Sequence, residues 1–198
     1  MRPFLLKKFV LSQILMLLLT SSYAYSPDST AVKRTYQTAF AKTIPVIDGL
    51  MNDDCWNLVD LTTDFIQTLP VENKPPSQQT AFNILYDNDN LYIFIRAYDT
   101  EPHKISKIMS RRDNFNGDMV FVDIDSHFDK QTDFLFCASA SGAKNDAAVT
   151  EDGNNEDESW NPVWFMKTSI DDKGWCAEME IPLTRGKHQK SLPDSTVR

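Results

Sequence analysis

The stretch 80–98, "TAFNILYDNDNLYIFIRAY", decides the fold. Two runs rich in β-branched and aromatic residues flank "DNDN" at 87–90, and these four residue types favour turns. In the second run Leu91, Ile93, Ile95 and Ala97 alternate with Tyr92, Phe94, Arg96 and Tyr98. Because successive side chains of a strand point to opposite faces, both faces of this strand are largely apolar. The stretch therefore predicts a β-hairpin whose second strand lies in the centre of a sheet.

Further short strands are predicted on both sides of this hairpin. They cover 44–47, at an edge because of Pro45, and 65–69, 119–125, 132–140, 162–170 and 175–181. "DDKG" at 171–174 predicts a second hairpin turn, and only 104–111 has a helical pattern. Many short strands with close turns and no alternation with helices indicate an all-β fold. We predict an antiparallel β-sandwich, jelly-roll-like.

The N-terminal segment has the pattern of a secretory signal peptide. Arg2, Lys7 and Lys8 precede an apolar run over 9–19, and the small residues Ser22 and Ala24 suit cleavage after residue 24. The run is shorter than the roughly 20 apolar residues of a membrane span. We therefore predict a signal peptide over 1–24 and export to the periplasm, the outer membrane or the cell exterior.

The charge of the chain limits its partners. The sequence has 28 acidic and 20 basic residues, a formal net charge of −8. Without residues 1–24, which carry three bases and no acid, 28 acidic residues face 17 basic ones, a formal −11. Such a chain repels nucleic acids and anionic lipids. We expect no nucleic-acid partner, whereas neutral ligands such as sugars are compatible with this charge.

The remaining segments define the expected organisation. Residues 25–42 are polar and are predicted to be a leader, 43–183 to be the sandwich domain, and 184–198 to be a polar tail. A sandwich usually has a closing strand where this tail stands, so we expect that strand to be missing or to come from elsewhere. Cys55, Cys137 and Cys176 allow one disulfide in three pairings, or three free thiols.

Four segments, taken in order, carry a family resemblance. They are "IPVIDGLMNDDCW" at 44–56, "LYDNDNLYIFIRAYDTEP" at 85–102, "GDMVFVDIDSHFDKQTDFLF" at 117–136 and "WNPVWFMKTSIDDKGWCAEMEIPL" at 160–183. Together they resemble a carbohydrate-binding module of family 9 type. More narrowly, they resemble the exported bacterial branch in which this domain precedes a large C-terminal region that is similar to an outer-membrane barrel.

The resemblance covers about residues 42–183 and implies a β-sandwich that binds sugar chains. Modules of this type hold the end of a glycan between tryptophans and hydrogen-bond it with polar side chains, and some contain structural calcium. This chain differs in ending before the family's closing strand and in lacking the C-terminal region. A truncated or frameshifted gene product would account for both differences.

Two tryptophans and an arginine are the main candidates for ligand contact. Trp160 and Trp164 flank Asn161–Pro–Val in a polar segment, and sugar rings stack on exposed aromatic faces. The alternative is that they fill the core, since Trp164 shares a strand face with Met166 and Ile170. Trp56 and Trp175 are expected in the core.

Arg96 stands among aromatic residues in the predicted central strand, where a charge needs a partner or a ligand. Its planar fork suits two neighbouring sugar hydroxyls, and a salt bridge to Asp118, Asp123 or Glu178 is the alternative. We predict that Trp160, Trp164 and Arg96 share one ligand surface, with Asp118 as an acid that contacts the ligand.

The many carboxylates have several interpretations. "DIDSHFD" at 123–129 and "TEDGNNEDE" at 150–158 offer oxygen atoms for calcium, but the first lacks the glycine and the final glutamate of an EF-hand, and solvated turns are the alternative. Glu178 and Glu180 are spaced on one strand face like a glycosidase pair, as are carboxylates on many strands. No GxSxG or HExxH motif is present. Calcium aside, we expect no cofactor and no enzymatic activity.

These observations predict a non-catalytic domain that binds a glycan or polysaccharide, in an exported bacterial protein linked to carbohydrate catabolism. Two alternatives remain open. The domain could be an accessory part or remnant of a secreted glycoside hydrolase, which needs two converging carboxylates in a deep pocket. It could also be a structural domain that docks on an outer-membrane barrel and binds no sugar, which predicts that no groove contains an exposed aromatic residue.

Overall fold

The computed structural model describes residues 34–108, 112 and 117–183. The chain divides into the units Met1–Tyr36 and Gln37–Arg198, and only residues 34–36 of the first are described. The predicted signal peptide (1–24), the first part of the predicted leader and the predicted tail (184–198) therefore lie outside the described residues. All elements below belong to the second unit.

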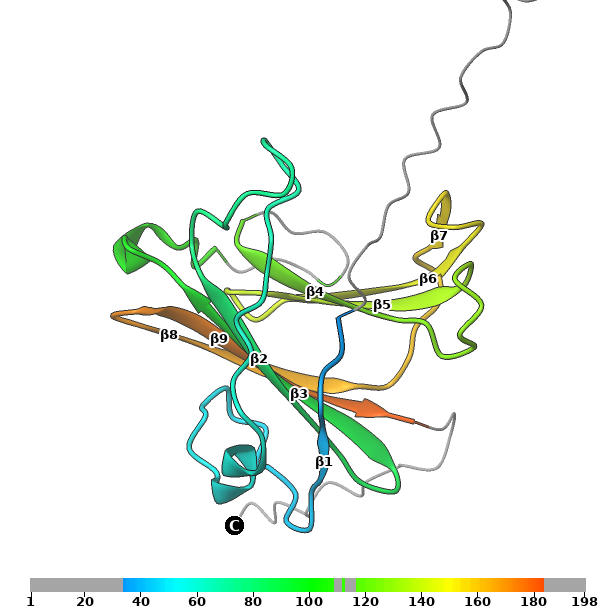
Figure 1. Ribbon diagram of the computed structural model, residues 1–198, viewed down its shortest axis with the longest axis horizontal. Coiled ribbons are helices and arrows are strands. Elements are labelled where there is room, and N and C mark those ends of the chain that lie inside the picture. Colours follow the sequence, from blue (N-terminus) through cyan, green and yellow to red (C-terminus); the bar gives the residue numbers. More distant parts are fainter. Residues whose placement is uncertain (1–33, 109–111, 113–116, 184–198) are drawn as a thin grey trace, which may run out of the picture. The chain divides into compact units, whose positions relative to one another are not determined.

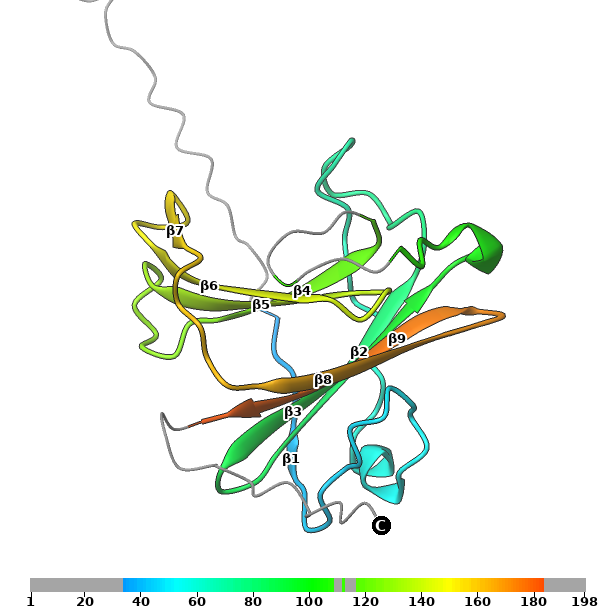
Figure 2. The ribbon, with the colours of Figure 1, turned by 180° about the vertical axis from the view of Figure 1, so that it is seen from behind.

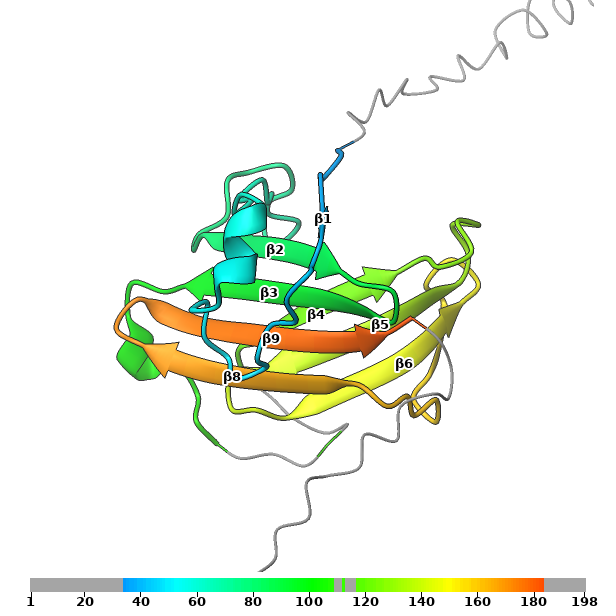
Figure 3. The ribbon, with the colours of Figure 1, turned by 90° about the horizontal axis from the view of Figure 1, so that it is seen from below.

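The larger sheet of this unit has five strands in the order β1-β2-β3-β9-β8. They are β1 (Ala39–Phe40), β2 (Thr80–Tyr86), β3 (Asn90–Tyr98), β9 (Gly174–Pro182) and β8 (Phe165–Asp171), and Figure 3 shows β2, β3, β9 and β8 side by side. Both predicted hairpins are confirmed, because Tyr86 pairs with Leu91 and Asp171 with Gly174. β3 lies between β2 and β9, as its two apolar faces predicted.

The smaller sheet has four strands in the order β4-β5-β6-β7. They are β4 (Met119–Ile124), β5 (Asp133–Ser139), β6 (Lys144–Thr150) and β7 (Asn155–Asp157). Figures 1 and 2 show β4, β5 and β6 as a layer stacked over the larger sheet. All strand pairs are antiparallel except β1 with β2, so the predicted antiparallel β-sandwich is confirmed.

The sequence did not predict β1, β6 or β7. β1 lies inside the segment predicted to be a leader, so the sheet begins before the predicted boundary at residue 43. Conversely, 44–47 forms no strand, and 65–69 contributes only the isolated bridge between Gln67 and Lys74. Of the predicted helix over 104–111, Lys104 ends the short 3-10 turn η2 (Pro102–Lys104), 105–108 are not helical, and 109–111 lie outside the described residues. None of the helical turns in the described residues could span a membrane.

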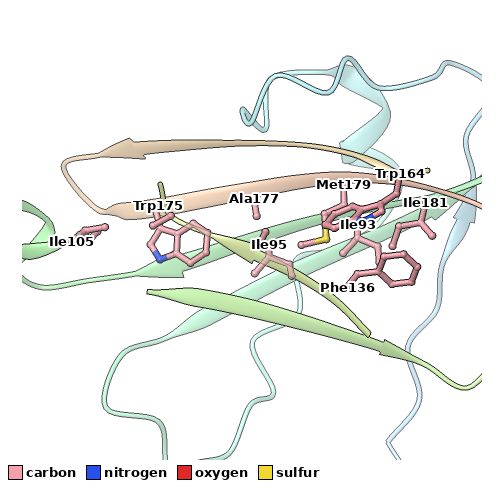
Figure 4. Packing of buried hydrophobic residues seen from close by; sticks show 11 residues of the cluster. Ile93, Ile95, Ile105, Phe136, Trp164, Trp175, Ala177, Met179 and Ile181 are labelled. Atoms are coloured by element: carbon pink, nitrogen blue, oxygen red, sulfur yellow. The ribbon is translucent and has the colours of Figure 1, made fainter. Parts of the chain in front are cut away.

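The core between the sheets consists of one face of each central strand. β3 supplies Ile93 and Ile95, β9 supplies Trp175, Ala177, Met179 and Ile181, and β5 supplies Phe136 and Ala138. Figure 4 shows most of these side chains packed between the strands, with Ile105 and Trp175 toward one end of the cluster and Trp164 and Ile181 toward the other. The predicted core position of Trp175 is confirmed, since it is 4% exposed. This burial is the main stabilising contribution to the fold.

A second buried layer covers the outer face of the larger sheet. The 3-10 turn η1 (Asp54–Leu58) lies against this face (Figure 3). Trp56 on η1 is 1% exposed, as predicted for a core residue, and its ring lies 5.8 Å from that of Phe94 on β3. Cys55 and Cys176 belong to the same cluster. All three cysteines are free and buried, so the alternative of three thiols is the one observed.

Candidate functional site

Arg96 lies on the outer face of the larger sheet and is 8% exposed. Its guanidinium binds Asp171 with both arms, Nη1 to Oδ2 at 2.8 Å and Nη2 to Oδ1 at 2.6 Å. Nη1 also lies 2.9 Å from Sγ of Cys176. The hydrogen bonds from Arg96 lower the pKa of Asp171 to about 2, and those to Asp171 raise the pKa of Arg96. The pair is therefore ionised at neutral pH.

This arrangement corrects two predictions about Arg96. Its partner is Asp171, at the turn between β8 and β9, and is none of the three acids considered from the sequence. Its fork is occupied by that carboxylate, so it is not available for the vicinal hydroxyls of a sugar. Arg96 instead makes a cation–π contact with Tyr98, since its Cζ lies 5.3 Å from the centre of the Tyr98 ring.

A groove of about 930 Å³ opens beside Tyr98 at one end of the larger sheet. It is lined by Thr63, Ser77, Gln78, Gln79, Tyr98, Asp99, Thr100, Asp172 and Lys173. The strand register brings these segments together, because Thr80 pairs with Ala97 and Tyr98 with Gly174. The groove is thus formed by the start of β2, the end of β3 and the β8–β9 turn.

Backbone hydrogen bonds hold the walls of this groove in place. The N–H of Tyr98 donates to the carbonyl of Gln79 at 2.9 Å, and the N–H of Asp99 donates to the carbonyl of Lys173 at 2.9 Å. Gly174 has a φ of +135°, and a Cβ there would lie 2.1 Å from the Ala97 carbonyl oxygen. Only glycine allows this close approach between the turn and β3.

The chemistry of the groove suits a polyhydroxylated ligand. Tyr98 is 38% exposed and offers a ring that a sugar can contact. Around it stand two amides, two carboxylates, hydroxyls and one ammonium group, which together can donate and accept hydrogen bonds. One contact within the wall, from Gln78 Nε2 to Thr100 Oγ1 at 2.9 Å, orients an amide toward its neighbours. The lining includes no histidine or cysteine, and nothing in it resembles an activated nucleophile.

The two predicted ligand tryptophans lie elsewhere. Trp164 is 1% exposed in the core between the sheets, where its ring meets that of Phe136 at 5.3 Å and 81°. Trp160 is half-buried and stacks on Phe134 at 4.7 Å and 27°. Both tryptophans thus contact the ring of Phe136 in the core between the sheets. Arg96 lies on the opposite face of the larger sheet.

The prediction that Trp160, Trp164 and Arg96 share one surface is therefore wrong. The physical reason is the alternation along β3 and β8: Ile95 and Met166 face the core, and Arg96 lies on the other face. Asp118 is exposed before β4, and its Oδ2 accepts the N–H of Ser106 at 3.4 Å. It does not join Arg96, and a contact of Asp118 with ligand stays a prediction.

The carboxylates of 123–129 act mainly as turn residues. Asp125 accepts the backbone N–H groups of Asp129 and Lys130, at 3.2 and 2.9 Å. Asp129 accepts those of Gln131 and Thr132, each at 2.8 Å. Among the described residues no group of three or more His, Cys, Asp or Glu side chains is placed to hold a metal ion.

The Glu178 and Glu180 pair is buried on the face that η1 covers. Glu178 is 0% exposed, and its oxygens accept the N–H groups of Asp48, Gly49 and Trp56 Nε1, each at 2.9 Å. Burial raises the pKa of Glu178. Glu180 is 7% exposed. This burial argues against the two as a hydrolytic pair.

A second groove of about 610 Å³ lies at the start of β8. Its walls are the apolar segment 44–47 with Gly142, Phe165 and Met166, and Lys144, Lys167 and Glu180 are its charged groups. Trp164, predicted from the sequence as a ligand residue, also lines this groove, although it is only 1% exposed. Lys144 Nζ is engaged, since it donates to the Trp164 carbonyl at 2.8 Å and lies 4.8 Å from the centre of that ring. The uncharged amides and hydroxyls that surround Tyr98 are missing from this lining, so the groove at Tyr98 is the better candidate.

Part of the Tyr98 groove follows from a local signal in the sequence. Once "DNDN" fixes the hairpin, Gln79 and Tyr98 must lie next to each other at its open end. "DDKG" places a second turn in the chain, but only the pairing of β3 with β9 brings Asp172 and Lys173 to the same place. That long-range pairing is not visible in the sequence.

Comparison with known proteins agrees with this fold. The model of a family described as carbohydrate family 9 binding domain-like matches residues 47–195. A carbohydrate binding module family 9 from Caldicellulosiruptor kristjanssonii, solved with glucose, has a TM-score of 0.54 and 20% identity, over 77% of this chain and 72% of that chain. The structure with cellotriose has a TM-score of 0.53 and 20% identity, over 75% and 69%. No curated protein matches this chain.

Proposed function

This chain belongs to the carbohydrate family 9 binding domain-like family, and from that premise we propose that it is a non-catalytic module that binds a glycan in the groove at Tyr98. The family match over 47–195 is the observation that carries the binding of sugar. The two similar structures are complexes with glucose and with cellotriose, which supports a sugar or a short glycan as the ligand. The position of the site rests on the composition of the groove.

Binding would need no covalent step. The exposed face of Tyr98 would contact the C–H groups of a sugar ring. The amides of Gln78 and Gln79 and the carboxylates of Asp99 and Asp172 would hydrogen-bond its hydroxyls. Arg96 would not contact the glycan. Its ion pair with Asp171 would hold in place the turn that carries Asp172.

The groove predicts a large effect for Tyr98→Ala. Loss of the ring contact from a preformed site should weaken glycan binding by about 1–3 kcal/mol, or roughly 5- to 150-fold. The measurement is calorimetry with glucose, cellotriose and a panel of soluble glycans, with circular dichroism to confirm that the variant is folded.

Tyr86→Ala is the matched control, because Tyr86 is also 38% exposed but lies at the other end of β2. It should leave the affinity unchanged. If the protein binds a glycan and Tyr98→Ala binds it as tightly, the site is not in this groove. If Phe165→Ala, in the second groove, weakens binding instead, the site is there. If no glycan binds at all, the proposed function is wrong.

We further propose that the domain is exported and belongs to a larger outer-membrane protein that handles polysaccharide. The basic, apolar and small-residue order of 1–24 supports export. N-terminal sequencing of the exported protein should begin at residue 25 or within a residue or two of it, and an intact Met1 would contradict this. If no glycan in the panel binds, the alternative of a structural domain that docks without binding sugar takes the place of this proposal.

A further inference from the structure

The groove at Tyr98 carries more negative than positive charge. Its lining includes the carboxylates of Asp99 and Asp172 and a single ammonium group, that of Lys173. Asp172 and Lys173 are exposed in the β8–β9 turn, and neither side chain forms an ion pair with another described residue. Both charges are therefore available to a ligand in the groove.

The carboxylate of Asp99 is held at the end of β3 and keeps one oxygen for a ligand. Its Oδ1 accepts the N–H of Glu101 at 2.6 Å, and none of the hydrogen bonds among the described residues uses its Oδ2. The backbone N–H of Asp99 donates to the carbonyl of Lys173 at 2.9 Å. This bond joins β3 to the turn that carries Asp172, so the two carboxylates belong to adjoining walls of one groove.

The charged groups next to the groove compensate one another. Arg96 binds Asp171 with both arms, at 2.6 and 2.8 Å, and Lys104 Nζ lies 2.7 Å from Glu101 Oε1. Neither pair adds net charge to the groove. The whole chain has a formal net charge of −8, so its long-range field has the same sign as the groove.

We propose that the groove selects glycans by charge: it prefers sugar units that carry an amine, accepts neutral units and disfavours uronic acids. This inference rests on the proposed function, since the groove must bind a glycan. A protonated amine would add a Coulomb attraction to Asp172 and Asp99 to the ring contact with Tyr98. A uronate would meet two like charges and one opposite charge. Asp172 would determine the specificity, because its carboxylate has no partner among the described residues.

Three trisaccharides with the same backbone and linkage test this ranking. Cellotriose is neutral, the corresponding trimer of glucosamine carries amines, and that of glucuronic acid carries carboxylates. At about pH 6 these amines are protonated and these carboxylates ionised. The glucosamine trimer should bind roughly 3- to 10-fold more tightly than cellotriose, and the glucuronic acid trimer should bind more weakly by a similar factor. These factors correspond to about one unit-charge interaction at a distance near 4 Å in water.

A charge reversal in the groove gives the sharpest comparison. Asp172→Lys makes the net charge of the lining positive and should reverse the order of the two charged trimers, while cellotriose changes least. Glu158→Lys, at an exposed position of the β7–β8 loop, changes the charge of the chain equally and should leave the order as it is. The measurement is calorimetry at low and at high salt. Salt should bring the three affinities together, because it screens exposed charges.

The outcomes separate this inference from the proposed function. A ranking that salt weakens and Asp172→Lys reverses supports the inference. Equal affinities for the three trimers overturn it, while cellotriose binding that depends on Tyr98 leaves the proposed function standing. A ranking that persists in Asp172→Lys also overturns it. If no trimer binds, the inference and the proposed function are both wrong. Because position 172 is exposed in a turn, the variant should stay folded, which circular dichroism checks.

Discussion

Trp164→Ala should lower the free energy of unfolding by about 3–5 kcal/mol, the cost typical of removing a large aromatic side chain from a core. Trp164 is 1% exposed, its ring meets Phe136, and Lys144 Nζ lies 4.8 Å from the ring centre. Alanine would leave a cavity at this end of the core and would remove the aromatic face under the Lys144 ammonium group. Urea denaturation followed by circular dichroism measures the loss.

Trp164→Phe is the control for size and polarity. The indole Nε1–H of Trp164 is buried and has no hydrogen-bond partner among the described residues, so its removal costs no hydrogen bond. The phenylalanine variant should therefore be clearly more stable than the alanine variant. The contrary result would be a Trp164→Ala protein that is as stable as the wild type but no longer binds glycan. That result would restore the sequence-based assignment of Trp164 to a ligand surface.

The fold was largely predictable because its decisive signals are local. The hairpin of β2 and β3 depends on turn residues next to apolar runs, and the alternation in β3 correctly separates Ile93 and Ile95 from Tyr92 and Phe94. Both kinds of signal act between residues close in sequence. Such signals give the strands, but they do not give their order in the sheets.

β6 was not predictable for a different reason. Lys144 and Asp146 interrupt its apolar pattern, although Asp146 is 1% exposed. Its charge is compensated by Arg112, with which it forms a salt bridge, and Lys144 is bound by the Trp164 carbonyl. Burial of a charged group depends on partners that come from elsewhere in the chain, so the pattern within one segment could not show that it is a buried strand.

The prediction of the ligand site was wrong for the same reason, because it too depends on contacts between distant parts of the chain. Arg96 was correctly identified as a charge in a central strand, but its partner Asp171 is 75 residues away and reaches it only through the hairpin of β8 and β9. Residue type, a polar flanking segment and the family resemblance predict Trp160 and Trp164 as sugar platforms. Residue type does not say which face of a strand is covered, and both Trp56 and Trp164 are on covered faces.

Glu178 connects the segment before η1 to the larger sheet. Its Oε2 accepts the backbone N–H groups of Asp48 and Gly49, and its Oε1 accepts Nε1 of Trp56. These donors lie more than 120 residues from Glu178 in the sequence. One carboxylate therefore fixes the covering layer on β9, and the layer leaves that carboxylate inaccessible to solvent.

Glu178→Ala should lower the free energy of unfolding by about 3–5 kcal/mol, because it leaves buried donors without an acceptor at a cost of roughly 1–3 kcal/mol each. Glu178→Gln should lose less, since its amide oxygen can still accept one of these hydrogen bonds. Glu158→Gln, at an exposed position of the β7–β8 loop, removes the same charge and should change little. Urea denaturation at neutral pH compares the three variants.

The pH dependence of Glu178→Gln gives the sharper test. Burial raises the pKa of Glu178 in the folded state, so the folded protein binds this proton more tightly than the unfolded chain does. The stabilisation from that proton is complete below the unfolded-state pKa of about 4.3 and is lost as the pH rises through the folded-state pKa. The difference in unfolding free energy between wild type and Glu178→Gln should therefore shift against the wild type as the pH rises from about 4 toward neutrality. Taking the difference removes the contribution of Asp171, whose lowered pKa acts in the opposite direction at much lower pH. A difference that is independent of pH over this range would mean that the three donors offset the desolvation of the carboxylate completely, and that its pKa is not raised.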